Sequence, residues 1–140
     1  MILACPHCHG LNRVPNERLA DKPVCGRCKS TLFAGAPLEL TEANFDAHAL
    51  KSELPLVVDF WASWCGPCQS FAPVFAAAAA EFEPQFRFGK LDTEAQRALA
   101  ARFAIRSIPT VMIIQGGKVI AQQAGALPKQ AFAQWLKQFA

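Results

Sequence analysis

The sequence has no tyrosine, and charged side chains make up only 18% of its 140 residues. Apolar side chains make up 52% and include eleven phenylalanines. Disordered chains have the opposite balance, so this composition predicts a folded protein with a dry core rich in phenylalanine. At this length we expect one ordinary domain together with a small addition.

Long apolar runs are absent as well, and none approaches the roughly 20 residues that a helix needs to cross a membrane. The start of the sequence, MILACPHCHG, also lacks the basic residues and following apolar stretch that mark a secretory signal. We therefore expect a cytoplasmic protein without a membrane partner. In that reducing compartment, Cys-x-x-Cys pairs more often bind metal or perform catalysis than form structural disulfides.

Positive charge is unevenly distributed along the chain. The formal net charge is +3, and residues 1–36 account for all of it, with five Lys or Arg against two acidic residues. Such an excess can favour nucleic acid. However, four thiolates and one divalent zinc ion would add about −2 charges and leave the segment near +1. Nucleic acid is therefore not an expected partner.

Six cysteines form three pairs with the same spacing. They are CPHC at 5–8, CGRC at 25–28 and WCGPC at 64–68. Spacing alone does not decide between metal binding and disulfide chemistry, because Cys-x-x-Cys serves both. The surroundings of each pair must therefore separate the two uses.

The first two pairs have sixteen residues between them, and this arrangement fits the rule for a tetrahedral structural zinc site. Few large apolar side chains occur here, so bound metal would supply folding free energy that a core cannot. We expect one zinc ion, held by Cys5, Cys8, Cys25 and Cys28. The alternatives are two disulfides or additional redox pairs, and we do not expect His7 or His9 to replace a cysteine.

The remainder of the chain alternates between strand and helix patterns. The segment TLFAGAP at 31–37 is typical of a linker. We therefore assign residues 1–36 to a zinc-binding module with its linker, and residues 37–140 to a second domain. Predicted strands lie at 38–41, 56–62, 86–92, 110–115 and 118–124, and predicted helices at 42–52, 65–82, 93–103 and from Pro128 onward. This order predicts an α/β domain with helices around a mixed central sheet.

The third cysteine pair follows a predicted buried strand and opens a predicted helix. At the start of a helix, unpaired N–H groups and the helix dipole would lower the pKa of Cys65 and make it a nucleophile. Cys68 lies one turn later on the same face and can attack a mixed disulfide formed by Cys65. The alternative is a metal half-site or a pair of ordinary buried cysteines.

The stretch VDFWASWCGPC at 58–68 resembles the active-site motif of the thioredoxin family, and SIPT at 107–110 resembles its cis-proline loop. The resemblance covers residues 38–140 and implies the thioredoxin fold, in which helices flank a mixed central sheet. It also implies a redox-active Cys65–Cys68 disulfide that reduces protein disulfides, because the Gly-Pro pair between the cysteines is typical of reducing members. A flavin- and NADPH-dependent thioredoxin reductase would recharge the dithiol.

Two charged residues on predicted strands gain roles from the resemblance. Asp59 interrupts an apolar run, where the resemblance implies a buried proton acceptor for Cys68 and the alternative is a satisfied or edge-facing carboxylate. Alternation places Lys90 on the same face as Phe86 and Phe88, where it would couple electrostatically to Asp59. The alternative for Lys90 is an ordinary surface position.

The resemblance also implies a surface that receives the substrate. The bond before Pro109 would be cis and lie beside Cys65, which would leave the backbone of Ile108 free to pair with an extended substrate segment. The alternative is a trans-proline at the start of a strand. The proposed substrate surface consists of Trp64, Gly66, Pro67, Ile108, Pro109 and Gly125, with Trp61 either supporting it or simply packing in the core.

A zinc module joined to such a domain resembles the thioredoxin 2 branch of the thioredoxin family, and Pro84 is a minor departure. We therefore predict an enzyme, a protein-disulfide reductase. The alternative is an interaction protein in which the zinc module docks a partner and the second domain is a scaffold. The sequence leaves the role of the module open between stability, redox sensing and docking.

Overall fold

A computed structural model describes residues 1–140, and a five-stranded mixed sheet forms its centre. The order of strands across the sheet is β3-β5-β4-β6-β7. β5 runs parallel to β3 and β4, whereas β6 runs antiparallel to β4 and β7. The strands are β3 (Leu38–Glu39), β4 (Leu56–Trp61), β5 (Arg87–Asp92), β6 (Thr110–Gln115) and β7 (Lys118–Ala124).

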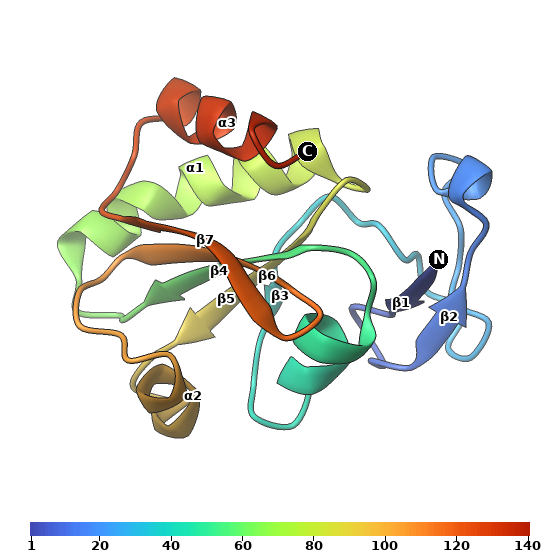
Figure 1. The fold of residues 1–140 in the computed structure, drawn as a ribbon, viewed down its shortest axis with the longest axis horizontal. Coiled ribbons are helices and arrows are strands. Elements are labelled where there is room, and N and C mark those ends of the chain that lie inside the picture. Colours follow the sequence, from blue (N-terminus) through green and yellow to red (C-terminus); the bar gives the residue numbers. More distant parts are fainter.

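Helices cover both faces of this sheet (Figure 1). α1 (Gly66–Phe82) and α3 (Lys129–Lys137) lie on one face, and α2 (Arg97–Arg102) lies on the other with the short π-helix η2 (Ala47–Lys51). One apolar core, rich in phenylalanine, fills the space between the sheet and α1 and α3, and a second core lies on the opposite face. The structure thus confirms the predicted α/β class and has the fold that the resemblance implies.

β4 is the central strand because its side chains suit burial on both faces. Its first five residues, from Leu56 to Phe60, are fully buried, as expected for an apolar strand with β-branched residues between two helical layers. Close packing also requires a glycine on the next strand. A Cβ atom at Gly89 would lie 2.6 Å from Cδ1 of Leu40, so a larger residue would push the β3 segment away.

Two sequence-based expectations about helix starts were wrong. The helix expected over 93–103 begins only at Arg97: the Thr93 hydroxyl donates to the Trp61 carbonyl oxygen, and Gln96 Oε1 accepts from the Glu42 N–H, so neither side chain caps this helix. The helix expected over 42–52 begins later, after a turn. In both places tertiary contacts compete with the local capping pattern, so the local pattern alone does not fix the start.

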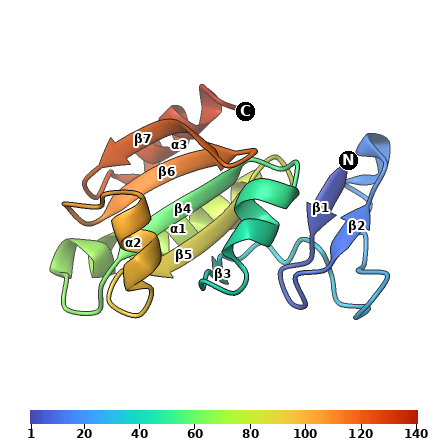
Figure 2. The same cartoon turned by 60° about the horizontal axis from the view of Figure 1, so that its bottom comes forward.

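The N-terminal module is a separate small sheet beside the larger domain (Figure 2). Antiparallel strands β1 (Ile2–Ala4) and β2 (Leu11–Arg13) are followed by the short 3-10 helix η1 (Asn16–Arg18). Leu54 of the larger domain belongs to the same apolar cluster as the buried side chains of the module. The module therefore has too small a core of its own and shares one with its neighbour.

A buried arginine joins the two parts of the molecule. Arg87 lies at the start of β5, and its side chain is only 2% exposed. Its guanidinium donates to the carbonyl oxygens of Leu32 at 2.7 Å and Ala4 at 3.1 Å, and it forms a 3.1 Å ion pair with Glu83. Glu83 in turn accepts the Gly35 N–H at 2.8 Å. The ion pair thus holds both the linker and the first strand of the module.

The Arg87–Glu83 pair should dominate the docking of the module. Replacement of Arg87 by Met would leave the Glu83 carboxylate buried without its partner, so we expect a loss of about 3 to 5 kcal/mol in the free energy of unfolding. Denaturant unfolding of the full chain measures this loss. The double variant Arg87→Met/Glu83→Gln should recover part of it, because no lone charge remains.

The matched control for this experiment is Arg18→Met. Arg18 forms an exposed 3.9 Å pair with Asp21, and such surface pairs contribute about 0 to 1 kcal/mol. Equal losses for Arg87→Met and Arg18→Met would contradict the docking role of Arg87.

Candidate functional site

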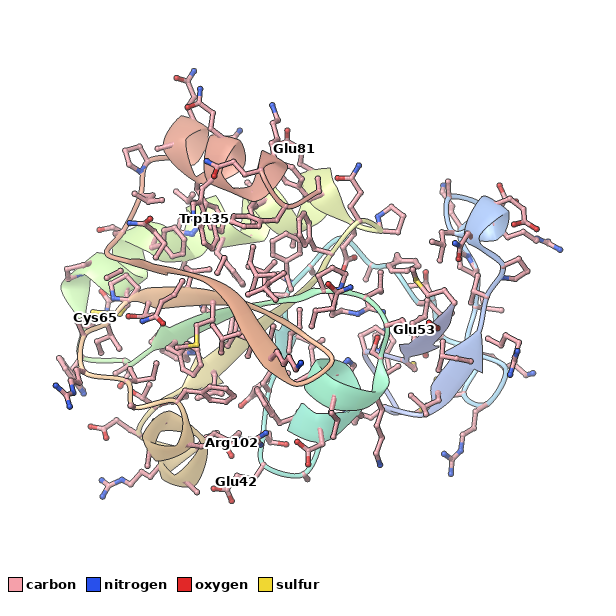
Figure 3. All side chains as sticks on the ribbon, viewed as in Figure 1. Glu42, Glu53, Cys65, Glu81, Arg102 and Trp135 are labelled. Atoms are coloured by element: carbon pink, nitrogen blue, oxygen red, sulfur yellow. A yellow bond between two sulfur atoms is a disulfide. The ribbon has the colours of Figure 1, made fainter.

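The third cysteine pair forms a disulfide at the junction of β4 and α1. Cys65 is the residue that precedes the first helical turn, and Cys68 lies within that turn. Their side chains are only 4% and 2% exposed, so a partner must reach them across a narrow surface. Figure 3 shows Cys65 at one end of the larger domain, remote from β1 and β2. The predicted strand-to-helix position of this pair is confirmed.

The N-terminus of α1 favours negative charge on the Cys65 sulfur. The backbone N–H of Cys68 donates to Cys65 Sγ at 3.2 Å, so the sulfur occupies the place of an N-cap oxygen. The positive end of the helix dipole adds to this effect. Once the disulfide is reduced, both contributions stabilise the negatively charged Cys65 thiolate, which is the nucleophilic form.

The loop before β6 closes over the disulfide. The Ile108–Pro109 bond is cis, as expected, and the Ile108 carbonyl oxygen lies 3.8 Å from Cys65 Sγ. On the far side of this loop, the Gly125 N–H donates to the Pro109 carbonyl oxygen at 2.9 Å. The loop therefore brings Ile108, Pro109 and Gly125 into one region beside Cys65.

The region next to the disulfide is open and partly apolar. Trp64 is 70% exposed, and its indole N–H donates to Glu94 at 3.2 Å. Gly66 and Pro67 are exposed at the start of α1, and no atom lies within 4 Å of a Cβ placed on Gly66. An exposed tryptophan next to uncovered backbone suits contact with another polypeptide.

Asp59 is a buried carboxylate on the central strand β4. It is fully buried, and neither of its oxygens has a hydrogen-bond partner. Burial raises the pKa of Asp59 to about 7, while the positive charge of Lys90 opposes part of that rise. An acid with this pKa can exchange a proton at neutral pH.

Lys90 lies opposite Asp59 on the neighbouring strand β5 but forms no ion pair with it. Its ammonium group lies 4.8 Å from the centre of the Trp61 ring, in a cation–π arrangement. Lys90 therefore acts on Asp59 through its charge at a distance. The Trp61 ring therefore contacts that lysine.

The four other cysteines gather in the N-terminal module. Cys5, Cys8, Cys25 and Cys28 are free thiols, and their sulfur atoms all lie within 4.8 Å of one another. Cys5 and Cys28 sulfurs are 3.6 Å apart, and those of Cys8 and Cys25 are 3.7 Å apart. A tetrahedral ion with metal–sulfur bonds of about 2.3 Å has sulfurs about 3.8 Å apart. The donor set therefore fits a tetrahedral metal ion, and the alternative of two disulfides is not found.

Backbone N–H groups stabilise negative charge on one of these sulfurs, which favours the binding of a cation. The N–H groups of Cys28 and Arg27 and the Asn12 side chain donate to Cys25 Sγ, and they lower the pKa of Cys25 to about 5. Burial instead raises the pKa of Cys5 to about 11. Four adjacent thiolates repel one another, so a bound cation is what would keep all four deprotonated together.

Sequence reasoning missed the residues at which the two parts meet. Besides Arg87 and Glu83, a hydrogen bond of 3.0 Å joins Nδ1 of His9 to Nε2 of His48. Burial lowers the pKa of His48 to about 3, so this imidazole stays neutral. The one available sequence signal was an arginine within the apolar pattern of residues 86–91. Neither histidine has a ligand's position, in agreement with the prediction for His9.

Comparison with known families separates the chain into the same two parts. A family model described as Thioredoxin matches residues 36–138. A second model, described as Thioredoxin 2, N-terminal, matches residues 4–30. The first match contains the disulfide, and the second contains the four clustered cysteines.

Individual relatives extend this similarity to nearly the whole chain. "Thioredoxin C-3" of Corynebacterium nephridii is 44% identical over 138 residues, which cover 99% of this chain and 94% of that protein. "Thioredoxin 2" of Chlorobaculum tepidum is 43% identical and covers 74% of this chain and 95% of its own length. "Thioredoxin" of Haemophilus influenzae is 41% identical, with 72% and 94% covered.

The raised pKa of Asp59 predicts a pH-dependent effect of its replacement. The folded protein binds this proton more tightly than the unfolded chain, so ionisation of Asp59 lowers stability as pH rises from about 4 to 7. Asp59→Asn should therefore be more stable than the wild type by about 4 kcal/mol above pH 7, with the difference vanishing below pH 4. Urea unfolding at several pH values measures this difference.

The exposed Asp21 provides the control, because Asp21→Asn should change stability by less than about 1 kcal/mol at every pH. A pH-independent effect of Asp59→Asn would contradict the raised pKa.

Proposed function

Because the chain belongs to the thioredoxin family, we propose that it reduces disulfides of other proteins with the dithiol of Cys65 and Cys68. The observation that carries this proposal is the Cys65 sulfur at the N-terminus of α1, 3.8 Å from the Ile108 carbonyl oxygen. A thiolate-stabilising position and a backbone segment for the substrate thus occur side by side. The reaction transfers two electrons from the dithiol to the substrate disulfide.

Cys65 performs the first step. Its thiolate attacks one sulfur of the substrate disulfide, the substrate S–S bond breaks, and the other substrate sulfur leaves as a thiolate that takes a proton from water. A mixed disulfide between Cys65 and the substrate remains. The N-terminal dipole of α1 favours this step, because it stabilises the attacking anion.

Cys68 performs the second step with help from Asp59. Asp59 takes the proton of the Cys68 thiol, and the resulting thiolate attacks Cys65 Sγ. The mixed disulfide breaks, the second substrate thiolate leaves, and the Cys65–Cys68 disulfide forms. A pKa of about 7 lets Asp59 accept and release protons at neutral pH, and the charge of Lys90 keeps that pKa from rising further.

The substrate binds as an extended segment next to the disulfide. Ile108 offers its backbone for pairing, and the cis-proline loop holds that backbone against Cys65. The apolar surface of Trp64 and the exposed backbone of Gly66 and Pro67 lie on the other side. This surface receives disulfide-containing proteins without demanding one particular sequence, because backbone pairing is shared by all of them.

A reductase must return two electrons to the oxidised pair after each cycle. We assign this role to an NADPH-dependent thioredoxin reductase, and the reducing cytoplasm is the compartment in which such a cycle and free cluster thiols persist. None of the helices has both the length and the apolar character needed to span a membrane.

Zinc is the ion that we assign to the cluster of Cys5, Cys8, Cys25 and Cys28. Four thiolates in tetrahedral arrangement are the usual ligand set of a structural zinc ion, which has no open position for catalysis. When bound, zinc supplies cross-linking and folding free energy and takes no part in electron transfer. We place the boundary of this module after residue 36, where the linker meets β3.

Replacement of either cysteine of the disulfide should block the reaction, but at a different step. Cys65→Ser removes the nucleophile. The rate of insulin reduction by dithiothreitol, after the rate without protein is subtracted, should therefore fall more than about a hundredfold. Cys68→Ser leaves the nucleophile in place, so the reduced variant, once freed of dithiothreitol, should accumulate as a mixed disulfide with insulin. Turbidity and mass spectrometry measure these two results.

Ser70→Ala, on the exposed side of α1, is the control and should retain full activity. A Cys65→Ser variant with wild-type activity would refute the proposed mechanism.

A further inference from the structure

The N-terminal module lies at the end of the molecule opposite the redox site. Cys65 and the sheet of β1 and β2 occupy opposite ends of the long axis (Figures 1 and 3). The module therefore cannot contribute a wall to the surface around Cys65. Its contacts with Arg87 and Glu83 nevertheless hold it in one orientation, so it presents a fixed outer surface.

The inner edge of the small sheet is already used for docking. The Ile2 N–H donates to the Glu53 carboxylate, and the Glu53 N–H donates to the Ile2 carbonyl oxygen at 2.7 Å. The Ala4 carbonyl oxygen accepts from Arg87 at 3.1 Å. The outward backbone groups of β1 thus pair with the larger domain.

The outer edge of the sheet, on β2, is open. The Val14 N–H donates to the Met1 carbonyl oxygen, so Met1 and Val14 form a hydrogen-bonded pair of this antiparallel ladder. Bonded and non-bonded pairs alternate, so Leu11 and Arg13 turn their N–H and C=O groups away from β1. None of these four groups has a hydrogen-bond partner in the structure. Figure 2 shows β2 on the outer side of β1, facing away from the larger domain.

A basic hollow adjoins this open edge. Its volume is about 380 Å³, and its lining includes three basic residues, Arg13, Arg18 and Lys22, one acidic residue, Asp21, and apolar walls from Val14 and Pro15. Arg18 makes only a 3.9 Å exposed contact with Asp21, and no carboxylate lies within ion-pair distance of Arg13 or Lys22. These cations are available to an external anion.

Exposed apolar side chains border the same surface. Leu11 is 52% exposed on β2, and Val24 is 58% exposed at the rim of the hollow. Large aliphatic side chains next to an unpaired strand edge are features that suit strand addition by a peptide.

We propose that β2 and the adjoining basic hollow dock an extended acidic segment of a partner protein. The segment would add as a third strand beside Leu11–Arg13, so that its backbone pairs with the open edge. Alternate acidic side chains would reach Arg13 and Lys22, and the apolar residues between them would contact Leu11 and Val24.

A polypeptide fits this surface better than a nucleic acid. A nucleic acid carries a negative charge on every phosphate, and Glu17 and Asp21 in the same segment would repel such a continuous row, whereas a peptide needs acidic side chains only opposite Arg13 and Lys22. Nucleic acid would also leave the open N–H and C=O pairs of Leu11 and Arg13 without matching donors and acceptors. A peptide strand supplies both.

Contacts with the four-cysteine cluster hold this edge in place. Asn12, between Leu11 and Arg13, accepts the Gly26 N–H at 2.9 Å and donates to Cys25 Sγ at 3.4 Å. The middle of β2 is therefore tied to one of the four clustered sulfurs. This tie gives the four-cysteine cluster a positioning role for the docking edge.

Binding of a fluorescent peptide of alternating valine and glutamate to the full, zinc-loaded, reduced protein tests this proposal. We expect saturable binding that weakens with added salt, together with NMR shifts of the amides of residues 11–13. Arg13→Glu/Lys22→Glu should weaken binding at least about tenfold, because both charge contacts reverse. Its zinc content and thermal midpoint should stay unchanged, since both side chains are exposed.

Two controls separate the components of the site. Lys129→Glu/Lys137→Glu, on α3, makes the same change in net charge elsewhere and should leave binding unchanged. A peptide that is N-methylated at alternate residues cannot pair along a strand edge, so it should bind at least about tenfold more weakly.

Several results would overturn the proposal. Equal binding of a valine–lysine peptide, or no effect of the Arg13/Lys22 reversal, would show that charge does not select the ligand. Tighter binding of duplex DNA than of the acidic peptide would assign the surface to nucleic acid. Concentration-dependent dimers that exclude the peptide would assign it to a second copy of the chain, and absence of binding at millimolar peptide would remove the site.

Discussion

The backbone at the end of β4 is the constraint on which the redox chemistry depends. This strand is buried on both faces, and a short turn over residues 62–65 joins it to the first turn of α1, so Cys65 occupies the position before the helix. There the N–H of Cys68 meets its sulfur at 3.2 Å. The same strand carries Asp59 into the interior, where burial raises its pKa to about 7. One apolar strand thus sets both the nucleophile and the proton acceptor.

The clustered cysteines have the same spacing but a different environment. Each of their pairs faces another pair across the module, and four sulfurs within 4.8 Å of one another suit a cation better than electron exchange. The Cys65–Cys68 pair has no such neighbours. Since Arg87 of the larger domain bonds to backbone next to Cys5, a metal ion bound at the cluster and the docking of the module would stabilise one another. Removal of residues 1–36 would leave Arg87 without two of its acceptors, so the stability of the larger domain depends in part on the module.

Much of the redox site could be predicted from sequence because its signals are local. A charged residue in an apolar strand singled out Asp59, and a cysteine pair at a strand-to-helix junction singled out Cys65, whereas the resemblance to the thioredoxin family implied the roles of Asp59 and Pro109. Arg87 gives a signal of the same kind but could not be assigned, because its acceptor Ala4 lies 83 residues away in another module. The helix expected from residue 93 begins only at Arg97 for a related reason: the Thr93 hydroxyl donates to the carbonyl oxygen of Trp61 on a neighbouring strand.

The central claim is that identical spacing serves two chemistries, metal binding in one module and electron transfer in the other. Zinc analysis combined with thiol counting on the fully reduced protein, first native and then denatured with a chelator, tests it most directly. The account predicts about one zinc per chain, two thiols that react in the native state, and four that react only after the metal is removed. Six freely reactive thiols and no bound metal would contradict it.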